Sequence, residues 1–201
     1  FIEQPHPDNP RLYRHRGEWK AFRRIDETIV IKSEENHVEL IDYTIHGPVI
    51  NREGGLVSAQ WTGLGETRDG LAIWMMNPAS NLTEALAGFD QIVIPTLSMA
   101  YADVDGNIAI HACGAIPLRM RGQGRIPMDG ASGEFDWRGF IPRQALPLAV
   151  TPQEHYVGSA NGRPASIGYP HYLGWMWDSS YRTRRMHELL AKCDGMTVKT
   201  M

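Results

Sequence analysis

Histidine offers the most obvious reactive chemistry in this sequence, because an imidazole ring can bind a metal ion or carry a proton near neutral pH. The chain contains eight histidines. None stands in the His-Glu-x-x-His spacing of a zinc hydrolase, and His187-Glu188 has no second histidine at the required position. His46 and His111 lie in apolar, strand-like segments, where an imidazole is usually hydrogen-bonded and structural. We therefore expect no metal catalysis, and a metal hydrolase that uses His46 or His111 is the less favoured alternative.

Other catalytic motifs that a single sequence can display are also absent. There is no Gly-x-Ser-x-Gly nucleophile turn, phosphate-binding loop or dinucleotide-binding glycine pattern. The net charge is −3 without a long run of one sign, so we expect no nucleic-acid partner and no membrane-surface partner. No apolar run approaches the ~20 residues of a membrane-spanning helix, and no signal peptide is recognised. Local motifs alone indicate only a β-rich globular chain.

With 201 residues, 42% of them hydrophobic, the chain is long enough to bury a core as one domain or two small ones. It starts at Phe1 without a methionine and ends at Met201 just after an apparent helix, so we expect a piece of a longer protein. The two cysteines, Cys113 and Cys193, are too few for a disulfide framework. Their pairing and the redox compartment stay open.

Asp105-Gly106 predicts a tight turn between two strands, because such a turn needs a positive φ that glycine adopts without strain. Bulky and small residues alternate over residues 97–102 before the turn and 107–111 after it. The sequence therefore predicts a central β-hairpin whose bulky face fills a core and whose small face accepts another layer. Residues 119–139, further on, predict an ordered loop too long to be a mere connection.

The N-terminal third is predicted to be β-rich after an irregular start. Residues 1–17 contain three prolines and few apolar residues, so we expect an extended surface segment there. Apolar runs separated by polar turns then predict an antiparallel meander. Its strands are expected at Thr28–Lys32, Val38–Ile45, Thr44–Ile50 and Leu56–Thr62, with a turn at residues 34–36.

Two helices are predicted. Asn81 can cap a helix over residues 81–90, and Glu84 three residues after the cap completes a capping box. A second helix over residues 179–192 follows from apolar residues at helical spacing, and Gly195 ends it.

Several short phrases follow one another along the chain in a characteristic order. They are Thr44-Ile-His-Gly-Pro-Val49, Gln60-Trp-Thr-Gly63, Tyr101-Ala-Asp-Val-Asp-Gly-Asn-Ile108, Gly114-Ala-Ile-Pro-Leu-Arg119, Trp137-Arg-Gly-Phe-Ile-Pro142, Ser159-Ala-Asn-Gly-Arg-Pro164, Tyr169-Pro170 and Tyr181-Arg-Thr-Arg-Arg-Met186. In this order, and over nearly the whole chain, they resemble the β-subunit of the penicillin acylase (penicillin amidase) family.

The resemblance implies an α+β fold of predominantly antiparallel β-structure, part of the αββα sandwich of N-terminal-nucleophile hydrolases. Residues 1–201 are then a single fragment of the β-subunit. The family makes a precursor that cuts itself, so that a serine becomes the first residue of the β-subunit and its α-amino group acts as the base. Phe1 has no nucleophilic atom, and the resemblance places the catalytic serine outside this chain. The implied partners are a small-molecule amide substrate and the rest of the precursor, namely the α-subunit and the N-terminal part of the β-subunit.

Four residues acquire roles from the resemblance. Asn161 matches the family's oxyanion-hole asparagine, with a turn-forming asparagine as the alternative. Arg182 matches an arginine that the family places near the nucleophile's amino group, with a solvated arginine of the first helical turn as the alternative. Trp61 and Leu97 match positions that line the acyl-side-chain pocket, although such residues on strands are more often core. Gly162 stands where the family often has a second asparagine.

Calcium and location follow from the resemblance only weakly. Family members bind calcium through acidic residues upstream of this chain and through a position near residues 170–173, where this sequence has His171-Tyr172 and no carboxylate. We therefore expect no cofactor for this chain and leave calcium open for the full-length protein. The family implies a periplasmic or secreted location, which this chain does not determine.

The predicted function is that of an amidohydrolase that cleaves the amide bond of a small N-acylated substrate, such as a β-lactam or an acyl-homoserine lactone. The alternative is a non-catalytic β-rich scaffold or interaction module. Because part of a layered sheet leaves apolar strand faces uncovered, we also expect the fragment to self-associate.

Overall fold

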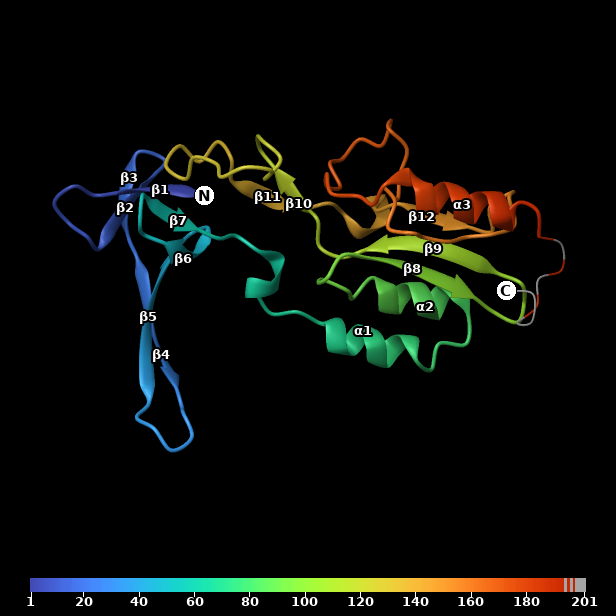
Figure 1. The fold of residues 1–201 in the computed structure, drawn as a ribbon, viewed down its shortest axis with the longest axis horizontal. Helices are drawn as coiled ribbons and strands as arrows, with labels where there is room; N and C mark the ends of the chain where they lie inside the picture. Colours follow the sequence, from blue (N-terminus) through green and yellow to red (C-terminus); the bar gives the residue numbers. More distant parts are fainter. Residues whose placement is uncertain (194, 196, 198–201) are drawn as a thin grey trace. The chain divides into compact units, whose positions relative to one another are not determined.

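The structure is a computed structural model and describes residues 1–193, 195 and 197 (Figure 1). The chain forms two compact units. Unit 1 consists of Phe1–Gly65 and Pro117–Gly139, and unit 2 consists of Glu66–Ile116 and the described residues from Phe140 onward. This division does not test whether residues 1–201 are a single β-subunit fragment, which stays a prediction. No helix in the described part of the chain is long and apolar enough to cross a membrane.

Unit 1 is built on a seven-stranded sheet in the order β3-β2-β1-β7-β6-β5-β4. All of its neighbouring strands are antiparallel, and the run from β4 to β7 is the predicted meander. The strands are β1 (Ile2–Pro5), β2 (Leu12–His15), β3 (Glu18–Ala21), β4 (Arg23–Ile29), β5 (His37–Thr44), β6 (Gly47–Asn51) and β7 (Leu56–Ser58). A short 3-10 helix, η1 (Thr62–Leu64), follows.

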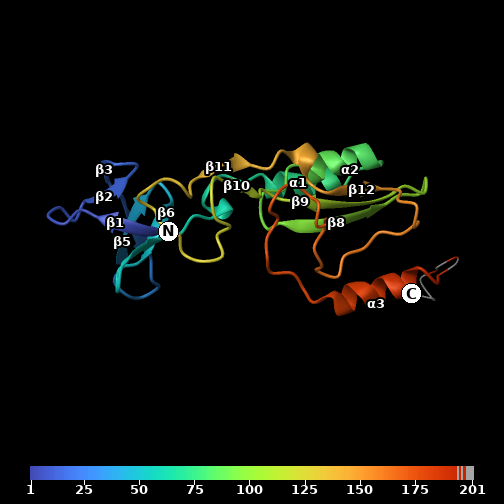
Figure 2. The same ribbon diagram turned by 90° about the horizontal axis from the view of Figure 1, so that it is seen from above.

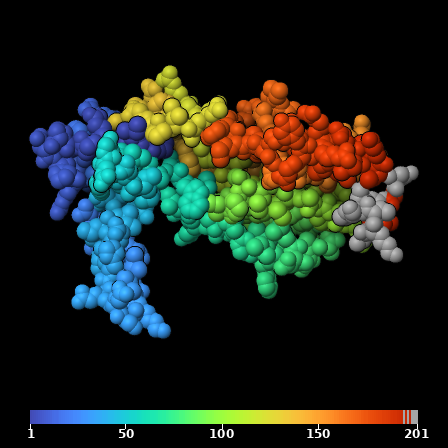
Figure 3. All heavy atoms as spheres, in the orientation of Figure 1, coloured from blue at the N-terminus to red at the C-terminus, as the bar shows by residue number. Residues whose placement is uncertain are grey.

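The β4–β5 hairpin extends away from the rest of unit 1 (Figures 1 and 3). The sequence predicts its first strand over Thr28–Lys32, but the strand begins at Arg23 and ends at Ile29. Charged residues in the early part of β4 obscure the strand pattern, and they find partners across the sheet. Arg24 donates two hydrogen bonds of 2.8 Å to Asp42 of β5.

The prediction of an extended surface segment over residues 1–17 is wrong in part. β1 pairs with both β2 and β7, so it lies inside the sheet. Glu3, Tyr13 and His15 are only 2–3% exposed. The prolines after β1 lie in the connection between two strands and do not exclude the strands themselves. Glu3 and His15 are buried although they are polar, because each is hydrogen-bonded to a polar side chain from a distant part of the sequence.

The long loop over residues 119–139 is ordered, as predicted, and it packs against β1. Ile2 donates a backbone hydrogen bond to Met128 (2.7 Å) and accepts one from Gly130 (2.8 Å). Two short strands, β10 (Pro117–Arg119) and β11 (Trp137–Phe140), pair with each other at its ends.

A buried charge network joins three segments of unit 1. His46 Nδ1 lies 2.8 Å from Glu3 Oε1, and His46 Nε2 lies 3.0 Å from Asp136 Oδ1. The other oxygen of Asp136 lies 3.1 Å from His15 Nε2 and 2.8 Å from Arg16 Nη2. A neutral imidazole has one N–H, so both contacts of His46 are hydrogen bonds only when its ring carries two protons. His46 therefore has the structural role that its apolar strand segment predicts.

The carboxylates of this network are favoured in their ionised form despite burial. Burial raises the pKa of Glu3, but hydrogen bonds from His46 and Ser58 outweigh it and the pKa is lowered. The pKa of Asp136 is also lowered, because hydrogen bonds from two histidines outweigh its burial. Since both pKa values lie below those of the unfolded chain, the stability they contribute is present above about pH 4. It is lost as the pH falls through the lowered values.

Unit 2 contains a three-stranded antiparallel sheet in the order β12-β9-β8. β8 (Leu97–Ala102) and β9 (Ile108–Cys113) form the predicted hairpin, and Gly106 of the turn has a φ of 86°. β12 (Leu148–Val150) pairs with β9, and a short 3-10 helix, η2 (Arg143–Ala145), precedes it.

Helices lie on both sides of this sheet, with α1 (Asp69–Met76) and α2 (Leu82–Phe89) on one side and α3 (Ser180–Leu190) on the other (Figure 2). α2 has its predicted cap, because Asn81 Oδ1 accepts a 3.0 Å hydrogen bond from the amide of Glu84. α3 is the second predicted helix. α1 is not predicted, because its apolar residues lie all around the helix and leave no polar stripe.

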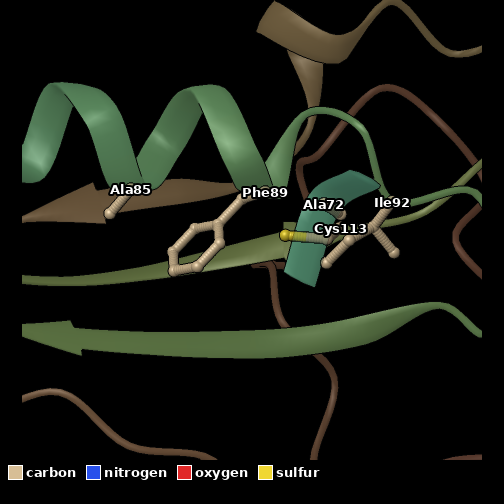
Figure 4. Close-up of a cluster of buried hydrophobic side chains, with 5 residues drawn as sticks. All are labelled: Ala72, Ala85, Phe89, Ile92 and Cys113. Carbon is tan, nitrogen blue, oxygen red and sulfur yellow. The ribbon is translucent and has the colours of Figure 1, made fainter. Parts of the chain in front are cut away.

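The core of unit 2 lies between α1, α2 and the hairpin (Figure 4). Its buried members are Ala72, Ala85, Phe89, Ile92 and Cys113. Met99 and Tyr101 from the bulky face of β8 pack against this cluster, as the alternation predicts. On the other face, Ser98 and Ala112 line a cavity of about 300 Å³ together with Thr183 of α3, and Ile110 lines it as well. The predicted division into a bulky and a small face therefore holds along β8 only, because β9 pairs Ile110 with Ala100.

Removing the shared partner of the two buried carboxylates should destabilise unit 1. We expect His46→Asn to lower the free energy of unfolding by about 3–5 kcal/mol, because it leaves Glu3 and Asp136 as buried carboxylates without their common partner. Chemical denaturation followed by circular dichroism measures the loss. His37→Asn is the matched control, because His37 also faces a carboxylate, that of Glu39, but both side chains are 57% exposed. Equal effects of the two substitutions would show that the network does not stabilise the fold.

Candidate functional site

The structure brings two of the predicted site residues into contact and places a third at the same cavity. Asn161 and Arg182 are hydrogen-bonded to each other, and Leu97 and Asn161 both line one cavity of unit 2. Trp61 belongs to unit 1, where it precedes η1 and is 58% exposed. Trp61 is not among the residues that line the cavity.

This cavity has a volume of about 450 Å³. It lies between the start of β8, the end of β9, the turn around Asn161 and the segment that leads into α3. Its apolar lining includes Leu97, Ile116, Pro164, Leu173, Met176 and Trp177. Its polar lining includes Thr96, Ser98, Ser159, Asn161 and Asp178. The lining is thus about equally apolar and polar. Small-molecule sites combine apolar surface with a few convergent polar groups.

The backbone of Asn161 adopts a left-handed conformation with a φ of 61°. Asparagine tolerates this region better than most residues do, which accounts for the turn that the local sequence predicts. The turn is held on both sides. The Asn161 amide donates to Ser159 Oγ (3.3 Å), and its carbonyl accepts from the Asp178 amide (3.0 Å). Asn161 is therefore a turn residue. The contacts of its side chain are separate from those of the turn and are described next.

The side-chain amide of Asn161 has one occupied end. Arg182 Nη1 donates a 3.0 Å hydrogen bond to Asn161 Oδ1. A guanidinium has no acceptor, so the atom that faces it must be the amide oxygen. Nothing in the described part of the chain accepts a hydrogen bond from Asn161 Nδ2. The donor end of the amide is thus available at the cavity wall.

Arg182 stands in the first turn of α3 and is 62% exposed along its side chain. Its Nη1 also donates a 2.6 Å hydrogen bond to Asp178 Oδ2. The hydrogen bond and charge of Arg182 lower the pKa of Asp178, which is therefore ionised at neutral pH. Arg182 is thus a solvated arginine of the first helical turn, which was the alternative to a role at the site. It also contacts Asn161, the predicted oxyanion residue.

Gly162 brings the turn close to α3. A Cβ atom at position 162 would lie 2.7 Å from Thr183 Oγ1, which is shorter than a normal contact. The turn that carries Asn161 can therefore approach the first turn of α3 only if residue 162 is small or Thr183 moves.

The metal alternative is not favoured by the geometry. Among the described residues, His15, His46 and Asp136 form the one group whose donor atoms lie within 4.8 Å of one another. These atoms are the partners in the hydrogen-bonded network of unit 1, where Arg16 adds a positive charge beside Asp136. His111 does not belong to the group, and its Nδ1 lies 3.1 Å from the Pro147 carbonyl. His46 and His111, the two histidines of the metal alternative, therefore both have structural hydrogen bonds.

One calcium position that the resemblance implies falls on residues 170–173 of unit 2. Residues 170–173 contain no side-chain carboxylate, whereas calcium prefers carboxylate and carbonyl oxygens. The segment therefore does not by itself fit the ion that the resemblance implies for the full-length protein.

Comparison with known proteins decides the family. The penicillin amidase family model matches residues 1–201. The chain belongs to the penicillin amidase family. Among curated members of similar sequence, acyl-homoserine lactone acylase QuiP of Pseudomonas fluorescens is 29% identical over 185 residues, covering 89% of this chain and 23% of that protein. Penicillin G acylase of Escherichia coli is 28% identical over 205 residues, covering 98% of this chain and 24% of that protein.

A solved structure shows the same fold. The thermostable penicillin G acylase from Alcaligenes faecalis superimposes with a TM-score of 0.83 at 24% identity, covering 99% of this chain and 36% of that chain. The predicted α+β fold with mostly antiparallel sheets is confirmed. This penicillin amidase chain spans about a quarter of the length of the curated relatives named above.

Sequence reasoning missed Asp178, which contacts both Asn161 and Arg182. Its signal was a spacing of four residues before Arg182, at which an acidic and a basic side chain meet on a helix. This signal is common on solvated helices, so it does not single out a functional residue.

Cys113 offers a test of how tightly the core of unit 2 is packed. The residue borders the cavity, but it is 1% exposed, and burial followed by the charge of Asp90 raises the pKa of its thiol to about 12. Because the thiolate is the reactive form, we expect iodoacetamide at pH 8 to alkylate the exposed Cys193 and to spare Cys113 until the protein is unfolded. Peptide mass spectrometry reads out each site, and Cys193→Ser should abolish labelling of the native protein. Rapid native labelling of Cys113 would contradict its burial in the core.

Proposed function

We propose that the protein of which residues 1–201 form a part is an amidohydrolase that cleaves the amide bond of a small N-acylated substrate. Membership of the penicillin amidase family supports an acylase. The similar curated proteins carry the names penicillin G acylase and acyl-homoserine lactone acylase. The substrate is accordingly a β-lactam amide or an acyl-homoserine lactone.

The observation that carries this proposal is the available Nδ2 donor of Asn161. When a nucleophile attacks an amide carbonyl, negative charge develops on the carbonyl oxygen, and a fixed N–H donor stabilises that charge. Arg182 occupies the opposite end of the Asn161 amide, so the amide cannot rotate without losing a charge-assisted hydrogen bond. The donor is therefore oriented before the reaction begins.

The nucleophile in this proposal is a serine outside residues 1–201, and its own α-amino group takes the hydroxyl proton. That amine must be unprotonated to act as a base. The guanidinium of Arg182 is a permanent cation beside Asn161, and a nearby cation lowers the pKa of an amine. Arg182 would thus support both the donor and the base.

The acyl group of the substrate is proposed to lie in the 450 Å³ cavity. Leu97, Met176 and Trp177 supply apolar surface there, which suits an aromatic or aliphatic acyl chain. The resemblance to the family also implies that Trp61 lines the acyl pocket, and we propose this role on that resemblance alone.

An interaction role is the second candidate, and one observation favours it. Apolar side chains of the β4–β5 hairpin are exposed to solvent, with Ile29 at 49%, Val30 at 78% and Leu40 at 54%. Uncovered apolar strand surface usually marks a contact with another chain or segment. The proposed partners are the α-subunit and the rest of the β-subunit, so this role accompanies catalysis and does not exclude it.

We expect isolated residues 1–201 to self-associate through this hairpin, because its apolar surface lowers its free energy by leaving water. Sedimentation velocity at increasing concentration measures the association. The double substitution Val30→Asp and Leu40→Asp should shift the chain toward monomer. Val104→Asp, at an even more exposed apolar position in unit 2, should not. A clean monomer for the parent chain would count against the exposed surface as an interface.

Substitution of Asn161 in the complete enzyme tests the proposed function. Asn161→Gly keeps the left-handed backbone and removes the donor, so we expect kcat to fall by about 10²–10³-fold while KM changes little. Asn161→Ala should lose as much activity and be less stable, since alanine is strained at a positive φ. Glu188→Ala is the control and should retain most activity, because Glu188 pairs with Arg185 and does not line the cavity. If correctly processed Asn161→Gly enzyme kept kcat within a few-fold of the parent, the oxyanion role would be wrong.

A further inference from the structure

We propose that Asp178 is a positioning residue of this site, whose carboxylate holds Arg182 against Asn161 and thereby aims the Nδ2 donor into the cavity. The inference rests on the proposed function, because the orientation of Asn161 matters for catalysis only if Asn161 is the oxyanion donor. In this proposal Asp178 acts through Arg182 and not on the reacting atoms.

Three hydrogen bonds close a ring among the three residues. Arg182 Nη1 donates both to Asp178 Oδ2 at 2.6 Å and to Asn161 Oδ1 at 3.0 Å. The backbone amide of Asp178 donates to the backbone carbonyl of Asn161 at 3.0 Å. One nitrogen of the guanidinium is thus shared by the two side chains, so the position that Asp178 gives to Arg182 also fixes the amide of Asn161.

Asp178 is a firm anchor because its own position is determined by the chain. Its Oδ1 accepts a 2.9 Å hydrogen bond from the amide of Ser179, directly before α3 begins at Ser180. An anionic side chain is favoured at the N-terminus of a helix, where backbone N–H groups point outward. The Asp178 side chain is also less exposed than that of Arg182, at 35% against 62%.

The Asp178–Arg182 ion pair contributes little to the stability of the fold. Exposed pairs of this kind contribute only about 0–1 kcal/mol, because water screens the charges and two flexible side chains must be ordered. Arg182 has many rotamers, and only some of them bring Nη1 to Asn161. A carboxylate four residues earlier selects those rotamers. The contribution of Asp178 therefore lies in orientation, which appears in the rate and not in the stability of the fold.

The experiment uses the complete, correctly processed enzyme and measures kcat and KM with an amide substrate that it turns over. We expect Asp178→Ala to lower kcat by about tenfold with KM within about twofold of the parent, because a misaimed donor weakens only the transition state. Asp178→Glu, which keeps the charge, should recover part of the loss. The matched control is Glu188→Ala, since Glu188 pairs with Arg185 on the same helix at 3.3 Å and has no contact with Asn161. Glu188→Ala should leave both constants unchanged.

A double-mutant cycle separates positioning from a general structural effect. In an Arg182→Ala background, Asp178→Ala should have no further effect on kcat, because Asp178 acts through Arg182. Additive losses, or a loss equal to that of Glu188→Ala, would overturn the proposal. A fall in thermal stability that parallels the fall in kcat would overturn it as well.

The same set of variants distinguishes failure of this inference from failure of the proposed function. If Asn161→Gly loses activity and Asp178→Ala does not, only the positioning role is wrong. If neither substitution affects turnover, the oxyanion assignment fails and the positioning role fails with it.

Discussion

Polar groups that leave water must find partners, and this requirement shapes unit 1 of the chain. In unit 1, Glu3 and Asp136 come from opposite ends of the unit in sequence and meet around His46. In unit 2, the side chain of Asn161 meets Arg182 at the start of α3. The first set is fully enclosed and stabilises the fold. The second lies at a cavity and leaves one donor of Asn161 available for a ligand.

The difference between the two sets follows from what each donor faces. His46 has both ring nitrogens directed at carboxylates, and the ring stays within the protein. The side-chain amide of Asn161 has a hydrogen-bond partner within the described chain only at its oxygen. An amide held at one end and open at the other can donate to charge that appears during a reaction, because no rearrangement is needed at that moment. The chemistry proposed for the site therefore depends on one side-chain donor of Asn161 that has no partner among the described residues.

Features with a local physical cause could be predicted from the sequence. Asp105-Gly106 specifies its turn through the conformational freedom of glycine, and Asn81 specifies the start of α2 through its side-chain cap. The strands β1 and β2 could not be predicted from residues 1–17, because their polar residues become buried only when distant partners arrive. α1 could not be predicted, because residues 71–76 are all apolar and such a run fits a buried strand as well as a helix.

The site was predictable in part and for a different reason. Asn161 and Arg182 came from the family resemblance, since 21 positions separate them and no local pattern links them. The hydrogen bond between them, and the part that Asp178 has in it, arises from the packing of the Asn161 turn on the first turn of α3. Such packing depends on backbone paths that no short motif encodes.

The close approach of Gly162 to Thr183 has a consequence for how this family diverges. Any side chain at position 162 would meet the γ-oxygen of Thr183, so these two positions form a steric pair across the turn and the helix. Relatives that carry a larger residue at the first position need a smaller or reoriented one at the second. Substitutions at the two sites should thus covary in evolution, and a lineage can cross from one combination to the other most easily through a glycine intermediate.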